Sequence, residues 1–143
     1  MRKDGWIALL VFLADRGAKL LARGLPPGGR VLIPGVLALR PARNTGMAFS
    51  LLSGHPALLA ALSAVIIAGA AWLLRGKTLR RVTRVGLMMM LGGALGNLTD
   101  RVLTGAVPDM IEPLFVRFAV FNVADACLVV GCGLVMLGIL REK

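Results

Sequence analysis

The sequence predicts an all-α polytopic membrane protein: four transmembrane helices with a small extracytoplasmic cap rich in β-structure. Two observations predict this fold class. Hydrophobic residues make up 57% of the 143 residues and charged residues only 17%. In soluble domains, hydrophobic residues average about 45–50% and charged residues about 25%. The chain also contains four apolar stretches, each close to the roughly 20 residues that a membrane-spanning helix needs.

The four expected spans lie at about residues 6–23, 57–74, 85–103 and 118–140. The first span starts with an apolar run and then carries Asp15, Arg16 and Lys19. The second contains no charged residue. The charges of the third lie near its end, and those of the fourth lie near its start. No internal repeat or composition boundary divides the chain, so residues 1–143 are expected to form a single integral membrane domain.

Lysine and arginine predict the orientation of these spans. They are concentrated before the first span, between the second and third, and after the fourth: Arg2, Lys3, Arg75, Lys77, Arg80, Arg81, Arg84, Arg141 and Lys143. Because cytoplasmic loops carry an excess of these residues, both termini are expected in the cytoplasm. Residues 24–56 then form an outer cap, with a short strand expected at residues 36–39, and residues 104–117 form an outer loop.

Several functional classes are excluded by composition. The net charge of +10 would suggest nucleic-acid binding in a soluble protein, but no basic helix with interleaved aromatic residues is present. The single histidine, His55, cannot supply an HExxH motif or a histidine-rich metal site. Cys127 and Cys132 lie five residues apart in one helical run, about 140° apart around its axis, and cannot bridge each other.

Polar residues of the spans converge near the outer surface. Ionisable groups inside a membrane are costly, so each one is a candidate functional residue. At about 1.5 Å per helical residue, three spans and the outer loop bring polar side chains to this level: Asp15, Lys19, Asn97, Asp100, Arg101, Asp109, Asn122 and Asp125. Asp15 is the deepest of them, near mid-membrane.

Some of these groups are expected to have structural roles. Asp15 and Lys19 are four residues apart on one helical face and are expected to form an ion pair that fixes helix packing. Asp100 and Arg101 are expected to form a buried network that holds the third span. Close helix approach is expected where the third span carries small residues at Gly92, Gly93 and Gly96.

Asp109 and Asp125 lack a basic partner nearby in the sequence. Two carboxylates in a partly dry site do not both ionise easily, so one takes up a proton while the other stays charged. An aspartic peptidase uses this arrangement to activate water and to stabilise the developing oxyanion. Two alternatives remain open on the residues alone. One is a small proton- or cation-coupled transporter with Asp100 and Asp125 as relay groups, and the other is an assembly protein whose polar cluster only packs helices.

Four ordered motifs resemble those of lipoprotein signal peptidase (signal peptidase II). They lie at residues 44–50 (NTGMAFS), 92–101 (GGALGNLTDR), 107–109 (VPD) and 121–125 (FNVAD). Asp15 and Lys19 resemble the Asp-x-x-x-Lys motif of the family's first span. The resemblance covers essentially the whole chain, and GNxxDR followed by FNxAD at this spacing is a specific signal.

The resemblance implies an intramembrane aspartic endopeptidase of the bacterial inner membrane. Such enzymes cleave prolipoproteins on the N-terminal side of a cysteine that carries diacylglycerol. Asp109 and Asp125 would be the catalytic pair, close to the outer face. The residues implied to shape the site and hold the substrate are Asn44, Gly46, Asn97, Asp100, Arg101 and Asn122, with Asp15 and Lys19 supporting the packing.

The same resemblance implies partners. The chain would work among membrane lipids, without metal or cofactor, and would be inhibited by cyclic peptides of the globomycin type. Apart from the resemblance, nothing in the sequence demands an oligomer, so a monomer is expected, and the pattern of basic residues predicts no nucleic-acid partner. Two positions depart from the family pattern. Arg16 stands where glutamine is usual and adds a charge beside the Asp15–Lys19 pair. Pro108 fixes φ and removes a donor beside Asp109.

Overall fold

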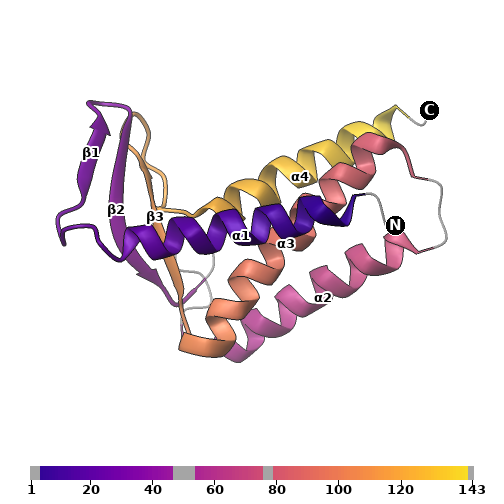
Figure 1. Ribbon diagram of the computed structural model, residues 1–143, viewed down its shortest axis with the longest axis horizontal. Helices are drawn as coiled ribbons and strands as arrows, with labels where there is room; N and C mark the ends of the chain where they lie inside the picture. The colour runs from indigo at the N-terminus through magenta and orange to yellow at the C-terminus, as the bar shows by residue number, and fades with distance from the viewer. Residues whose placement is uncertain (1–3, 47–53, 76–78, 142–143) are drawn as a thin grey trace.

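The computed structural model describes residues 4–46, 54–75 and 79–141. Its elements follow in the order α1 (Gly5–Ala22), β1 (Arg30–Ile33), β2 (Leu37–Asn44), α2 (Pro56–Leu74), α3 (Arg81–Thr104), β3 (Val107–Pro113) and α4 (Val123–Leu140). Figure 1 shows the helices extending away from a sheet that lies at one end of the molecule. Helix α1 begins and α4 ends at the opposite end, where α2 also gives way to α3.

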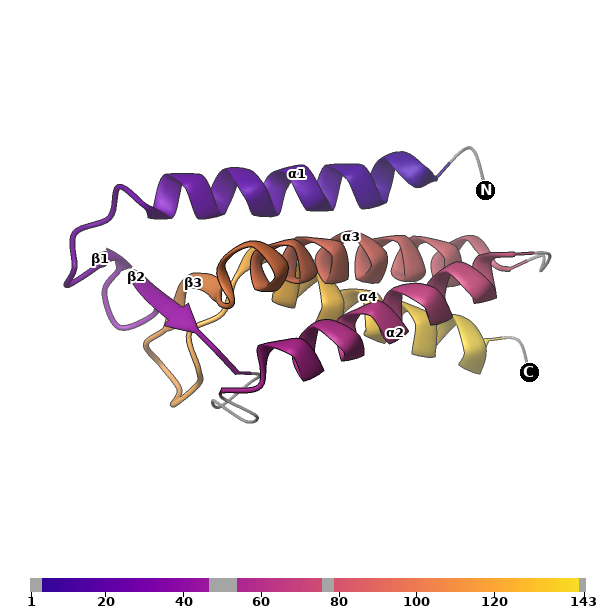
Figure 2. The same cartoon turned by 90° about the horizontal axis from the view of Figure 1, so that it is seen from below.

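Helix α3 is the centre of the helical part and contacts each of the other three helices. Figure 2 shows α1 along one side of α3 and α2 and α4 along the other. Small residues permit this packing, as expected: a Cβ on Gly92 would lie 2.5 Å from the Ala8 carbonyl oxygen of α1. A Cβ on Gly93 would lie 2.6 Å from a carbonyl oxygen of α4. The close approaches expected at these glycines are confirmed.

The helices present apolar side chains to their surroundings. Leu9 on α1, Val65 on α2, Val102 on α3 and Val129 on α4 are all exposed. Helices α2 and α4 are long and apolar enough to cross a membrane. Charged residues interrupt the apolar character of α1 and α3, and some of these residues are buried between the two helices rather than exposed.

The apolar core lies at the end of the bundle away from the sheet. It consists of side chains from α1, α2 and α3: Ala8, Ala70, Leu74, Leu87 and Met88. The other end of the bundle, next to the sheet, buries polar side chains instead. The molecule is therefore divided along its length into an apolar half and a half with a polar interior.

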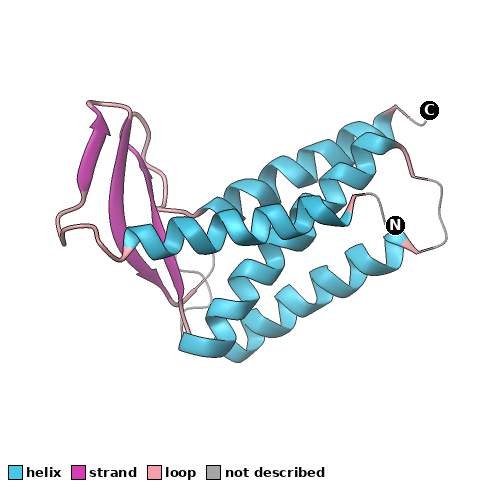
Figure 3. Ribbon diagram, viewed as in Figure 1, coloured by secondary structure: helices cyan, strands magenta, loops and turns pink. Residues whose placement is uncertain are grey.

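The sheet is antiparallel, with strand order β1-β2-β3 (Figure 3). Ala42 of β2 pairs with Asp109 of β3, and Asn44 pairs with Val107. The register shifts between Leu39 and Ala42, where Pro41 lacks the N–H that a central strand normally donates. Beyond the shift, Asn44 and Asp109 lie diagonally on one face, within reach of each other.

Several expectations about segment boundaries differ from the structure, and the third helix, expected from residue 85, begins as α3 at Arg81. The outer cap was expected from residues 24–56 alone, but its third strand, β3, comes from the loop expected at residues 104–117. The short strand expected at residues 36–39 extends as β2 to Asn44. The fourth apolar stretch was expected to start at residue 118, whereas α4 begins at Val123. The differences in the cap and at the start of α4 arise because pairing between β2 and β3, and capping by Asn122, depend on partners that local hydropathy does not reveal.

We predict that Gly131→Ala destabilises the bundle, because a Cβ at Gly131 would lie 2.6 Å from the Gly86 carbonyl oxygen of α3. Overpacking of this kind costs about 1–3 kcal/mol. The thermal midpoint in detergent should fall for this variant. Gly133→Ala is the matched control on the same helix, since nothing lies within 4 Å of its added methyl group. Equal midpoints for the two variants would contradict the packing described for α3 and α4.

Candidate active site

Strand β3 carries Asp109 into the interior beside the helices. The residue is only 2% exposed, because the neighbouring pairing with β2 holds the strand against the bundle. The Asp109 carboxylate accepts a hydrogen bond from Asn44 Nδ2 at 2.9 Å and another from Asn122 Nδ2 at 2.6 Å. Pro108 is accommodated because β3 is the outer strand of the sheet, where a missing N–H is tolerated. Asp109 was expected in a loop and instead lies in a strand.

Asp125 lies in the first turn of α4, where a capping box holds it. Asn122 Oδ1 accepts a hydrogen bond from the Asp125 backbone N–H at 2.9 Å, and the Asp125 carboxylate accepts one from the Asn122 backbone N–H at 3.4 Å. This reciprocal arrangement satisfies donors that a helix start leaves open. The other carboxylate oxygen of Asp125 accepts from Asn97 Nδ2 at 2.7 Å. The position of Asp125 thus follows from where α4 begins.

Asn122 connects the two carboxyl groups. Its side chain is fully buried, and its Nδ2 donates both to Asp109 and, at 3.3 Å, to Asn97 Oδ1. A single amide therefore contacts Asp109, caps the helix that carries Asp125, and contacts the amide that binds Asp125. Displacing Asn122 would disturb both carboxylates together.

Behind these amides lies a group of four charged side chains, here called the α1–α3 ion cluster: Asp15, Arg16 and Lys19 of α1, and Asp100 of α3. Lys19 Nζ lies 2.7 Å from both Asp15 Oδ2 and Asp100 Oδ2, so the expected pairing of Asp15 with Lys19 is confirmed. Arg16 binds both oxygens of Asp100, each at 2.6 Å. Asp15 Oδ1 also accepts from the Ala124 backbone N–H of α4 at 3.0 Å.

Asp100 belongs to a buried network that holds α3, as expected, but Arg101 does not take part in it. Asp100 faces α1 and binds Arg16 and Lys19, whereas Arg101 donates to the Gly46 carbonyl oxygen at 3.1 Å. Adjacent residues of a helix point about 100° apart, which separates their partners. Sequence reasoning did not find the role of Arg16, which was regarded only as a departure. Its position one residue after Asp15, on the side of α1 that meets Asp100, is visible only in the fold.

The environment of Asp109 favours the protonated carboxyl. Burial raises its pKa from the ordinary value of 3.8 to about 6, and the nearby Asp125 adds to this effect. The amide donors of Asn44 and Asn122 act in the opposite direction, as does the charge of Lys19. A carboxyl group with a pKa near 6 can hold or release a proton close to neutral pH.

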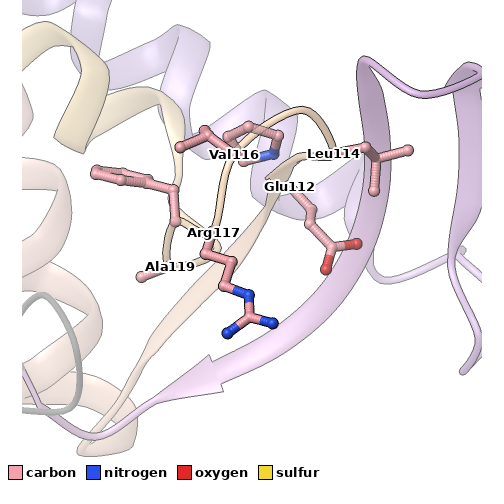
Figure 4. A pocket seen from close by; sticks show the side chains of 7 residues that line it. Glu112, Leu114, Val116, Arg117 and Ala119 are labelled. Carbon is pink, nitrogen blue, oxygen red and sulfur yellow. The ribbon is translucent and has the colours of Figure 1, made fainter.

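A groove of about 630 Å³ opens beside Asp125. Its polar end is formed by Asn44, Asn97, Arg101 and Asp125, and the rest is lined mainly by apolar side chains of α2 and α4, such as Leu62 and Val129. A separate, more open hollow of about 540 Å³ lies along the chain after β3 (Figure 4). Glu112 and Arg117 line it, but neither Asp109 nor Asp125 does. Of these two hollows, only the groove is lined by a member of the Asp109–Asp125 pair.

The residues that the structure describes contain no cluster of potential metal ligands. Among residues 4–46, 54–75 and 79–141, no three His, Cys, Asp or Glu side chains are grouped as they would be around a metal ion. The chemistry available to the site is that of two carboxyl groups, three amides and one guanidinium group.

Residues 7–141 match the family model described as signal peptidase (SPase) II. The chain belongs to the signal peptidase II family. The lipoprotein signal peptidase of Thermosynechococcus vestitus is 39% identical over 132 residues, which cover 88% of this chain and 84% of that protein. The lipoprotein signal peptidase of Streptococcus pneumoniae is 36% identical over 149 residues, covering 100% of this chain and 97% of that protein.

Two solved structures of bacterial membrane enzymes have the same fold. One bacterial membrane enzyme superposes with a TM-score of 0.89 at 29% identity, covering 96% of this chain and 87% of that one. Another superposes with a TM-score of 0.85, also at 29% identity, covering 96% and 92% of the two chains. This member of the signal peptidase II family is therefore a bacterial membrane protein of a peptidase family. The alternative transporter hypothesis, with Asp100 and Asp125 as relay groups, finds no support in these matches.

We predict that Lys19→Met strongly destabilises the protein. The change leaves Asp15, which has no exposed side-chain surface, without its closest cation, and removing one partner of a buried ion pair costs about 3–5 kcal/mol. The measurement is the thermal midpoint in detergent. The exposed Arg23, near the end of the same helix, provides the control variant Arg23→Met. A Lys19→Met protein as stable as that control would show that the buried cluster contributes little to folding.

Proposed function

We propose that this protein is an intramembrane aspartic endopeptidase that cleaves diacylglyceryl-modified prolipoproteins on the N-terminal side of the lipidated cysteine. Membership of the signal peptidase II family supports the reaction and the substrate class. One observation carries the catalytic type: Asp109, which is buried, and Asp125, which is half-buried, share the amide Asn122 beside an apolar groove.

The proposed reaction is general acid–base hydrolysis. One carboxyl group of the pair is ionised and takes a proton from a water molecule, whose oxygen attacks the carbonyl carbon of the scissile peptide bond. The protonated partner stabilises the oxyanion that develops, and a proton then passes to the leaving amine as the C–N bond breaks. The products are the carboxylate of the signal peptide and the amino group of the lipidated cysteine. The raised pKa of Asp109 supports a shared proton near neutral pH.

The surrounding polar residues have supporting roles in this proposal. The amides of Asn44, Asn97 and Asn122 orient the two carboxyl groups through the hydrogen bonds described above. Arg101 lines the groove and donates a hydrogen bond to the Gly46 carbonyl oxygen, and we propose that these two residues hold the substrate backbone. Three charges of the ion cluster, those of Asp15, Lys19 and Asp100, support the packing.

The groove between α2 and α4 is the proposed binding site for the apolar part of the substrate. Its length is lined by aliphatic side chains, and its polar end lies at Asp125. An apolar signal-peptide segment in this groove would bring its end to the carboxyl pair while the acyl chains of the lipidated cysteine remain in lipid. Burial of apolar substrate surface supplies binding free energy at about 25 cal/mol per Å².

We further propose that α1, α2, α3 and α4 all cross the membrane as one domain, with both termini in the cytoplasm. The basic residues Arg80, Arg81 and Arg84 lie at the start of α3, at the end of the molecule away from the sheet. Because Lys and Arg favour the cytoplasmic side, the sheet and the carboxyl pair would lie near the outer face. The proposal includes a monomeric enzyme among membrane lipids, inhibited by globomycin-type cyclic peptides that occupy the same groove.

Asp109→Asn and Asp125→Asn are each predicted to lower kcat by about 1,000-fold or more. When residues act as one catalytic unit, removing one of them lowers kcat nearly as much as removing all of them. The assay is gel-shift cleavage of a diacylglyceryl-modified prolipoprotein in detergent, with the unmodified protein as a second substrate. Glu112→Gln, a carboxyl change on the same strand β3 outside the groove, should cleave like wild type. An active Asp125→Asn enzyme would refute the proposed mechanism.

The pH dependence of cleavage should have an alkaline limb set by Asp109. Its proton is lost as the pH rises through a pKa of about 6, so kcat/KM should decline above that pH. Asn44 donates to the ionised form and thereby lowers this pKa. Asn44→Ala should therefore raise the pKa and move the alkaline limb to higher pH, besides lowering the rate. Profiles from pH about 4.5 to about 8.5 test this, and a limb that stays in place or moves to lower pH would contradict it.

A further inference from the structure

Arg16 is the one member of the α1–α3 ion cluster to which the proposed function assigns no role. Its two terminal nitrogens bind the two oxygens of Asp100, each at 2.6 Å. One of them also lies 3.2 Å from the Gly96 carbonyl oxygen and 3.2 Å from Asp15 Oδ2. The guanidinium carbon lies 5.8 Å from the centre of the Phe12 ring. These contacts fix the guanidinium group in one orientation between α1 and α3.

The hydrogen bonds of Lys19 link the position of Arg16 to the amides around Asp125. An ammonium group has three N–H donors, and Lys19 Nζ has three acceptors: Asp15 Oδ2 at 2.7 Å, Asp100 Oδ2 at 2.7 Å and Asn97 Oδ1 at 3.0 Å. Each donor is therefore used once. The bond to Asn97 is the longest of the three and the one that joins the cluster to the amides around Asp125.

The bond from Lys19 determines which way the Asn97 amide faces. Its Oδ1 accepts from Lys19 and Asn122, so its Nδ2 is directed to Asp125 Oδ1 at 2.7 Å. In the flipped orientation, an NH₂ group would face the ammonium and an oxygen would face the carboxylate. Both contacts would be repulsive. Lys19 thereby selects the orientation in which Asn97 donates to Asp125.

Arg16 controls how strongly the carboxylates compete for Lys19. With Arg16, the cluster contains two carboxylates and two cations and is formally neutral. Without it, Asp15 and Asp100 would share the single charge of Lys19, and the cluster would carry a net charge of −1. Charges buried at 7% exposure or less interact far more strongly than charges in water. The ammonium would then be drawn towards the two carboxylates and away from the neutral Asn97 oxygen.

We propose that Arg16 is a positioning residue for peptide cleavage: by neutralising Asp100, it leaves an N–H of Lys19 for Asn97 and so orients the amide that binds Asp125. The inference rests on the proposed function, in which Asp125 is one of the two catalytic carboxyl groups. Arg16 itself contacts neither carboxyl group of the pair. It acts from α1 through Asp100, Lys19 and Asn97.

A double-mutant cycle between Arg16 and Asp100 tests the inference. The variants are Arg16→Met, Asp100→Asn and the double variant, with kcat and KM measured on the diacylglyceryl-modified prolipoprotein and expressed per folded enzyme. Arg16→Met should lower kcat about tenfold with little change in KM, because the substrate groove does not include Arg16. Adding Asp100→Asn removes the surplus negative charge, so the double variant should be more active than Arg16→Met.

Two further variants make the result decisive. Arg16→Lys keeps the positive charge and should recover most of the lost kcat, which a role in shape alone would not produce. Arg23→Met removes an exposed cation from the end of the same helix and should leave both constants unchanged. If Arg16→Met folds poorly, the comparison of Asp100→Asn with the double variant still measures Arg16. In the absence of the Asp100 charge, removing Arg16 should then cost little.

Three outcomes would overturn the inference: kcat per folded enzyme unchanged in Arg16→Met, a loss confined to KM, or effects of the two substitutions that simply multiply. The catalytic assignment is tested separately in the same assay by Asp125→Asn. Activity in that variant would refute the proposed function whatever Arg16 does. An inactive Asp125→Asn enzyme together with a fully active Arg16→Met enzyme would refute only the role of Arg16.

Discussion

A buried ammonium group is the constraint on which the rest of this structure depends. Lys19 lies 4% exposed in the middle of a helical bundle, and an unpaired charge in such a place is not tolerated. Two carboxylates and an amide oxygen surround it. Because these acceptors come from two helices, satisfying one charge fixes α1 against α3. Asp15 extends the constraint to α4, since its second oxygen accepts from the Ala124 backbone N–H.

Small residues make that arrangement sterically feasible. A Cβ at Gly96 would lie 2.6 Å from Asp15 Oδ2, where only glycine leaves room. Gly92, one turn earlier on α3, allows the backbone of α1 to approach at Ala8. The polar end of the bundle is thus held by ion pairs and hydrogen bonds, and the apolar end by close packing. Van der Waals packing and interhelical polar contacts are the forces expected where lipid removes the hydrophobic drive between helices.

The same network explains how the proposed site for hydrolysis can be rigid before substrate binds. Asn97 and Asn122 each use both ends of their amide groups, so neither can rotate without losing hydrogen bonds. Asp125 is further fixed by the helix start that it helps to cap. Asp109 arrives from a separate element, the sheet, where Asn44 holds it. The proposed catalytic pair comes from a strand and a helix and is joined by a buried amide, so the fold orients it before a ligand binds.

The sequence by itself determined the number and approximate position of the helices, because apolar stretches of this length are visible without knowledge of partners. It also identified the polar residues that gather at one end, including Asp109, Asp125 and the Asp15–Lys19 pair. For the residues in helices, the spacing along the sequence predicts the helix face and the position along the helix axis. Its motifs were sufficient to indicate the family. The catalytic roles of Asp109 and Asp125 remain predictions.

Only the tertiary structure decided which groups are partners. Pairing of β2 with β3 turned an expected loop into a strand and buried Asp109, and no local pattern encodes a contact across 65 residues of chain. Asp100 pairs with Arg16 and Lys19, and not with its neighbour Arg101, because α1 packs on the face of α3 that carries Asp100. Hydropathy and spacing describe each segment alone, whereas the partners of a buried charge depend on how segments from different parts of the chain are packed together.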